Sequence, residues 1–189
     1  MSDYNDSFLF LLPLAIAAII YFLFINRGKG SKNEEQNKDA IPTITSKPII
    51  TITANYVLAD DNWNISTGTR MALEILSKRT CIFVFAIVKD KDEAALAKKL
   101  LSEKLNGLVE SNHILPCQTA MGCASMARQL ESSAHFDYNP EAIHQASIFI
   151  PSILIAPPSV ESPHAKWANS SFEDFITGGN TEFFSILPK

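Results

Sequence analysis

An unbroken run of uncharged and mostly apolar residues, beginning at Phe8 and ending at Ile25, constrains this chain more than any other feature. A bilayer core of about 30 Å is crossed by roughly 20 helical residues, and about 17 is the lower limit. Leu, Ile and Phe make up most of the run, and they favour insertion enough to tolerate Pro13 near one end. We therefore expect a single transmembrane helix over residues 8–26.

The charges beside this run predict its orientation. Acidic residues precede it within residues 1–7, and Arg27, Lys29 and Lys32 follow it. Basic residues stay on the cytosolic side, so residues 1–7 form a short non-cytosolic N-terminus and the rest of the chain faces the cytosol. A cleaved signal peptide is the alternative, but such peptides have a basic start and a small-residue cleavage site, neither of which this segment has.

The remainder divides into a polar segment and one domain. Residues 27–47 are rich in Lys, Asn, Glu, Gln, Ser and Thr, a composition that predicts a flexible tether. Residues 48–189 have the length of one cytosolic domain with an aromatic C-terminal extension. The formal net charge of −4 argues against a nucleic-acid-binding surface.

Short apolar runs alternate with helical patterns through this domain. The run at residues 81–88 is continuously apolar, which is typical of a strand covered on both faces, whereas residues 135–137 suggest a brief edge strand. Asp90, Thr119 and Asn139-Pro140 mark helix starts. The alternation predicts an α/β fold with a mostly parallel sheet flanked by helices. The predicted strands are residues 49–54, 81–88, 113–116, 135–137 and 152–156, and the first predicted helix is residues 66–77.

The cysteines are odd in number and lie within or beside apolar segments. They are Cys81, Cys117 and Cys123. This pattern favours reduced thiols in a cytosolic compartment over a disulfide framework, in agreement with the predicted orientation.

The sequence offers little support for catalysis or cofactor binding. No predicted strand is followed by a dinucleotide-binding glycine cluster or a phosphate-binding Gly-Lys-Ser/Thr loop. Cys117 or Ser125 could act as a nucleophile with His135 and Asp137, although a buried, inert thiol is the more common explanation for Cys117. Cys117, Cys123, His113 and His135 could be proposed as zinc ligands. However, the sequence has no Cys-x-x-Cys or His-x-x-x-His pair that would fix two ligands on one turn. We expect no cofactor and no metal.

Four segments resemble the peroxisome assembly protein 22 family. They are residues 114–122 (ILPCQTAMG), 127–130 (ARQL), 135–141 (HFDYNPE) and 149–155 (FIPSILI). The order of an acidic N-terminus, one span, a tether and a small α/β domain is also similar to that family. The resemblance implies a Rossmann-like domain without catalysis, in a docking factor of the peroxisomal membrane. Such a factor recruits and co-activates the ubiquitin-conjugating enzyme peroxin 4, close to the RING ligases, for ubiquitination and recycling of the import receptor. A membrane-tethered α/β enzyme of unknown reaction is the alternative.

The contact surface for such a partner is a separate prediction. Trp167, Phe172 and Phe175 follow the proline-bounded segment after the last predicted strand, where the regular pattern ends. Buried aromatic residues supply much of the energy at protein interfaces, so we expect these three residues to contribute to partner binding. Packing against the domain's own core is the alternative. Arg128 is a further candidate for partner contact, or for an ion pair with Asp137.

Overall fold

A computed structural model describes residues 47–187 of the chain. The predicted N-terminus at residues 1–7, the predicted transmembrane helix at residues 8–26 and all but the last residue of the predicted tether lie outside these residues. Among the described helices, none has both the length and the apolar character needed to cross a membrane.

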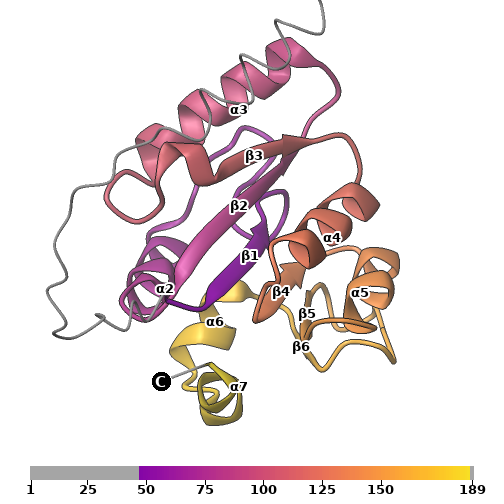
Figure 1. Ribbon diagram of the computed structural model, residues 1–189. Coiled ribbons are helices and arrows are strands. Elements are labelled where there is room, and N and C mark those ends of the chain that lie inside the picture. Colours follow the sequence, from indigo (N-terminus) through magenta and orange to yellow (C-terminus); the bar gives the residue numbers. More distant parts are fainter. Residues whose placement is uncertain (1–46, 188–189) are drawn as a thin grey trace, which may run out of the picture. The chain divides into compact units, whose positions relative to one another are not determined.

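The described residues form one α/β domain around a six-stranded parallel sheet (Figure 1). The strand order is β3-β2-β1-β4-β5-β6. The strands are β1 (Ile49–Thr53), β2 (Cys81–Ile87), β3 (Ile114–Cys117), β4 (Ala134–Asp137), β5 (Ser152–Ile155) and β6 (Trp167–Asn169). The predicted α/β class with a mostly parallel sheet is confirmed.

Helices cover both faces of this sheet, and local side chains set where they begin. Ser66, Asp90, Thr119 and Asn139 each accept a hydrogen bond from a backbone N–H in the first turn of the helix that follows. The helices are α2 (Thr67–Ser77), α3 (Lys91–Lys104), α4 (Ala120–Gln129), α5 (Pro140–Ser147), α6 (Phe172–Thr177) and α7 (Thr181–Ile186).

The two faces of the sheet have different cores. Side chains of α2, α3, α6 and α7 join Ile50, Ile52 and Phe136 in the larger apolar cluster. Side chains of α4 and α5 join Phe85 in a smaller cluster made largely of alanines. Because successive residues of a strand point to opposite faces, β2 contributes Val84 to the larger cluster and Phe85 to the smaller one.

Two sequence predictions about the sheet are wrong. The strand predicted at its edge, β4, lies between β1 and β5, and all four of its residues are buried. The regular pattern also does not end at the prolines, because Trp167 begins β6, which pairs in parallel with β5. Strand β6 has only three residues and therefore shows no periodicity.

Candidate functional site

The strand order places the candidate site at the carboxyl ends of β1 and β4. From β1 the chain adds β2 and β3 on one side of the sheet, and it then returns to add β4, β5 and β6 on the other. Parallel α/β proteins bind ligands in the crevice where the order reverses in this way. Here the last residues of the two strands are Thr53 and Asp137, and both are fully buried.

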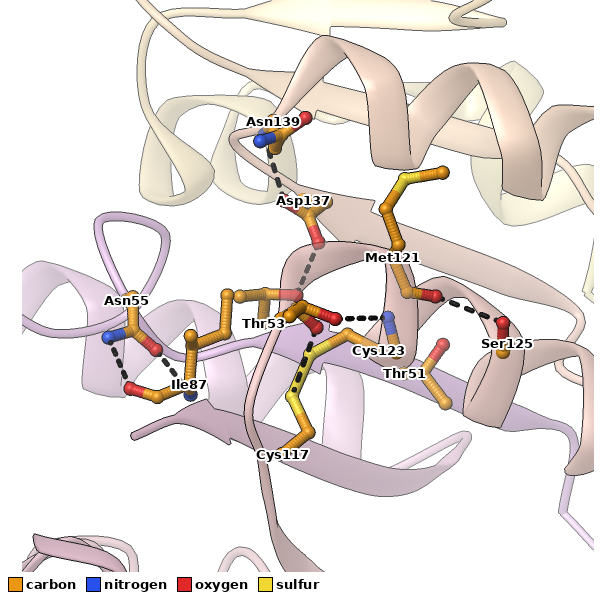
Figure 2. Close-up of a disulfide and its surroundings, with 12 residues drawn as sticks. Thr51, Thr53, Asn55, Ile87, Cys117, Met121, Cys123, Ser125, Asp137 and Asn139 are labelled. Carbon is orange, nitrogen blue, oxygen red and sulfur yellow. Dashed lines mark hydrogen bonds between the residues drawn. A yellow bond between two sulfur atoms is a disulfide. The ribbon is translucent and has the colours of Figure 1, made fainter. Parts of the chain in front are cut away.

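Hydrogen bonds from within the protein engage both oxygens of the Asp137 carboxylate (Figure 2). The Thr53 hydroxyl donates to Oδ2 at 2.6 Å, and the backbone N–H of Asn139 donates to Oδ1 at 2.8 Å. A buried carboxylate is costly unless such donors are present. The pair therefore stabilises the junction of the two strands and the start of α5.

The polar side chains continue along the same face of the sheet. Thr51 and His135 are register partners on β1 and β4, and the Thr51 hydroxyl lies 3.0 Å from Nδ1 of His135. Ser132 donates to the Thr51 hydroxyl at 3.1 Å. Nε2 of His135 lies 3.4 Å from Oδ2 of Asp137, yet it makes no hydrogen bond within the described residues. We call Thr51, Thr53, Ser132, His135 and Asp137 the polar row.

Strand alternation explains how the sequence builds this row. Thr51 and Thr53 are two residues apart on β1, and His135 and Asp137 are two residues apart on β4. Residues with that spacing share a face, and the parallel register aligns the two pairs. Sequence reasoning singled out His135 and Asp137 but missed both threonines. The alternation of Ile and Thr in β1 is the signal that could have found them.

The loop after β1 occupies the mouth of the crevice. The Asn55 amide donates to the backbone carbonyl of Ile87 at 3.1 Å and accepts from its N–H at 2.8 Å. Tyr56 packs edge-on against Tyr138, with ring centroids 4.9 Å apart. Burial raises the pKa of the Tyr138 hydroxyl, and the nearby Asp137 carboxylate adds to that effect. The loop after β1 thus contacts both the end of β2 and Tyr138, which follows β4.

Ser125 and His113, two further candidates from the sequence, do not join His135 and Asp137 at this crevice. The Ser125 hydroxyl donates to the Met121 carbonyl within α4 and accepts from Gln145. His113 stacks on Phe83 and faces Cys81, with 3.8 Å between Nδ1 and the sulfur. Among the described residues, no group of three or more His, Cys, Asp or Glu side chains could hold a metal ion.

The cysteines differ from the sequence prediction. Cys117 and Cys123 form a disulfide, whereas Cys81 is free. The turn between β3 and α4 brings the two sulfur atoms together, although six positions separate the residues. The odd number of cysteines did not indicate this disulfide. The third cysteine, Cys81, begins β2 and stays unpaired. Burial raises the pKa of the Cys81 thiol, and the Glu110 carboxylate raises it further.

The four side chains expected to contact a partner lie in different surroundings. Phe172 and Phe175 are buried and pack edge-on against Phe136 in the domain's own core. Trp167 is half-buried, with its ring 6.3 Å from that of Phe175. Arg128 is exposed and makes no ion pair with Asp137; its guanidinium lies 4.9 Å from the centre of the Phe149 ring.

The strand order and the helices on both faces of the parallel sheet define a Rossmann-like α/β domain. Residues 42–176 match the family described as Peroxisome biogenesis protein 22, Haloacid dehydrogenase-like domain. This match covers well over half of the chain, so the chain belongs to that family. Family membership supports a role in peroxisome biogenesis. The resemblance found in the sequence is confirmed.

One solved structure supports the fold. A haloacid dehalogenase-like hydrolase from Burkholderia xenovorans LB400 is similar, with a TM-score of 0.56 and 8% identity over 74% of this chain and 99% of that one. A de novo designed Rossmann 3x3 protein is also similar, with a TM-score of 0.41 and 17% identity over 71% of this chain and 93% of that one. No curated protein matches the chain significantly.

Proposed function

We propose that this protein is a non-catalytic docking factor of the peroxisomal membrane. A helix at residues 8–26 anchors it, and its domain faces the cytosol. There it recruits the ubiquitin-conjugating enzyme peroxin 4 and enhances that enzyme's activity toward the cycling import receptor.

The observation that supports this proposal is the family match over residues 42–176, together with the state of the crevice. Both Asp137 oxygens and the Thr53 hydroxyl are engaged inside the protein. Asn55 is likewise engaged in both directions with Ile87. A catalytic group must be able to reach its substrate, and these groups are committed to each other.

Recruitment to a membrane increases rates through effective concentration. A flexible tether of about 20 residues has a root-mean-square span of roughly 25 Å. A docked enzyme would then remain close to ligases in the same membrane, at a local concentration near millimolar. This benefit needs no chemistry from the docking domain.

A binding experiment tests the proposal. Immobilised residues 45–189 are incubated with purified peroxin 4 and, as a matched control, with a cytosolic ubiquitin-conjugating enzyme of similar size. We expect saturable retention of peroxin 4 alone, measured by surface plasmon resonance. Equal retention of the two enzymes, or of neither, would contradict the proposal.

Arg128 is the partner-binding candidate with a fully available side chain, and it defines a surface to test. Its guanidinium covers Phe149, which is exposed together with Ile148. Exposed arginine and aromatic groups of this kind often dominate binding energies. We expect Arg128→Ala to weaken peroxin 4 binding about tenfold.

Arg79 provides the matched control for that variant, because its guanidinium lies 5.7 Å from the Phe184 ring in another part of the domain. We expect Arg79→Ala to leave the affinity unchanged. Trp167→Ala is measured in the same series, with the melting temperature recorded, because its half-buried ring packs on the core. Equal losses for the two arginine variants would place the contact surface elsewhere.

A further inference from the structure

The disulfide lies at the surface end of β3, beside the candidate site (Figure 2). Cys117 is the last residue of β3, and Cys123 lies in the N-terminal part of α4. Their Cα atoms are 6.4 Å apart, within the range that a disulfide spans without backbone movement.

The two cysteines differ in access. Cys117 is half-buried and lines a cavity of about 350 Å³ together with Asp90, Lys91 and Gln118. Cys123 has no exposed surface and belongs to the apolar cluster of α4 and α5. Cys117 is therefore the more accessible of the two residues, and it packs against the apolar cluster that holds Cys123.

Hydrogen bonds also hold the turn between β3 and α4. The backbone N–H of Val88 donates to the Cys117 carbonyl at 2.9 Å, which holds the end of β3 on β2. The Thr119 hydroxyl accepts from the N–H of Gly122 at 3.0 Å, which fixes the start of α4. The two thiols of a reduced protein would thus remain adjacent, and closing the bond would be an intramolecular reaction. The positive end of the α4 dipole also stabilises negative charge on a sulfur at the helix start.

From this arrangement we propose that Cys117 and Cys123 form a reversible redox site that takes a peroxide as its oxidant. The Cys117 thiolate attacks one oxygen of hydrogen peroxide, which breaks the O–O bond, releases hydroxide and leaves a sulfenic acid. The Cys123 sulfur then displaces hydroxide from that sulfenic acid and forms the disulfide. Two thiols and one peroxide give one disulfide and two waters. A dithiol reductant reverses the reaction.

Cys81 serves as the internal reference. It is half-buried, it is the free cysteine, and its pKa is raised, so less of it is thiolate at neutral pH. Trypsin separates it from the pair. Cys81 lies between Arg79 and Lys89, whereas both other cysteines lie between Lys104 and Arg128 with no Lys or Arg inside that peptide.

The test uses the full chain in mild detergent, reduced and then exposed to a small excess of hydrogen peroxide. Peptide mass spectrometry after alkylation follows both peptides. We expect the peptide that ends at Arg128 to lose two hydrogens at least about tenfold faster than Cys81 is oxidised. Dithiothreitol should restore both thiols while the protein stays folded. Cys81→Ser should behave like the unmodified chain, and Cys117→Ser and Cys123→Ala should not form the bond.

Three outcomes would overturn the proposal. The first is independent addition of oxygen to the two sulfurs. The second is a disulfide that dithiothreitol cannot reduce in the folded protein, which is the mark of a purely structural bond. The third is pairing through Cys81. If Cys123→Ala does not fold, Cys117→Ser, which changes the half-buried position, still tests whether peroxide acts on this pair. Circular dichroism shows whether each variant is folded. The proposal does not depend on the docking function.

Discussion

The two faces of β1 and β4 are built on opposite principles. On one face, Ile50, Ile52 and Phe136 pack into the larger apolar cluster. On the other, Thr51, Thr53, His135 and Asp137 belong to the polar row, and α4 packs against both strands. Apolar burial is tolerant of small changes in geometry, whereas buried polar groups stabilise a fold only when each finds its partner. One face therefore supplies most of the stability, and the other specifies how the two halves of the sheet join.

The largest expected effect is on the apolar face. Phe136 is fully buried, and its ring lies 5.2 Å from Phe172, 5.6 Å from Phe175 and 5.5 Å from Phe183. Phe136→Ala should lower the free energy of unfolding of residues 45–189 by about 3–5 kcal/mol, measured by urea denaturation. Phe149→Ala makes the same change at an exposed site and should be close to neutral. Similar losses for both would show that the aromatic cluster is not the main apolar contribution.

The second effect is on the polar row. Asp137→Ala removes the acceptor for the Thr53 hydroxyl and the Asn139 N–H. Leaving buried donors unpaired should cost about 2–3 kcal/mol. Asp137→Asn keeps an acceptor oxygen and should cost less.

A double-mutant cycle with Thr53→Val measures the coupling across the two strands, which we expect to be about 1 kcal/mol. A coupling near zero would mean that the polar row does not join the halves of the sheet. A loss from Asp137→Ala as large as that from Phe136→Ala would remove the distinction between the two faces.

A third, smaller effect concerns the contact of α2 with α6 in the apolar layer. The Ser66 hydroxyl accepts from the N–H of Thr69 at 2.9 Å and donates to the Glu173 carboxylate at 2.9 Å. Ser66→Ala should destabilise the domain by about 1–2 kcal/mol, because it removes a helix cap. Glu173→Gln should retain most of the stability, since its amide oxygen can still accept. If Glu173→Gln costs as much as Ser66→Ala, charge at the helix start matters more than the cap.

The smallest effect is a pH dependence in the loop after β1. Hydrogen bonds from the backbone N–H and side chain of Asn64 lower the pKa of the Asp60 carboxyl below its ordinary value of 3.8. A group whose pKa is lowered by folding stabilises the native state above its unfolded pKa, and this contribution is lost as the pH falls through the folded value. The stability difference between the unmodified domain and Asp60→Asn should therefore be present at pH 7 and fade below about pH 3.8. Thermal melts over this range measure it, and a difference that grows toward low pH would contradict the assignment.

Local sequence signals were sufficient for the helix starts and for most strands. Asp90 and Thr119 cap their helices as expected, and Asn139 with Pro140 begins α5. Side-chain burial was predicted less well. The helical spacing of α2 offers Met71, Leu73, Ile75 and Leu76 for the buried side, but only Leu73 and Leu76 are buried.

Ser170 and Glu173 have the sequence spacing of a helix-capping pair, but the structure does not form that pair. Ser171 caps α6 and bonds to the N–H of Asp174, while Glu173 reaches the start of α2. Ser66 and Glu173 are 107 positions apart, so no local pattern could indicate their contact.

The amino-acid sequence by itself determined the α/β class, the starts of α2 to α5 and the family. These depend on periodicity, capping residues and short segments whose meaning is local. Only the tertiary structure decided that β4 is central, that β6 completes the sheet, that Thr53 meets Asp137 and that Cys117 meets Cys123. Each of these facts depends on which distant segments become neighbours, and strand order is set by the packing of the whole chain and not by any one stretch of it.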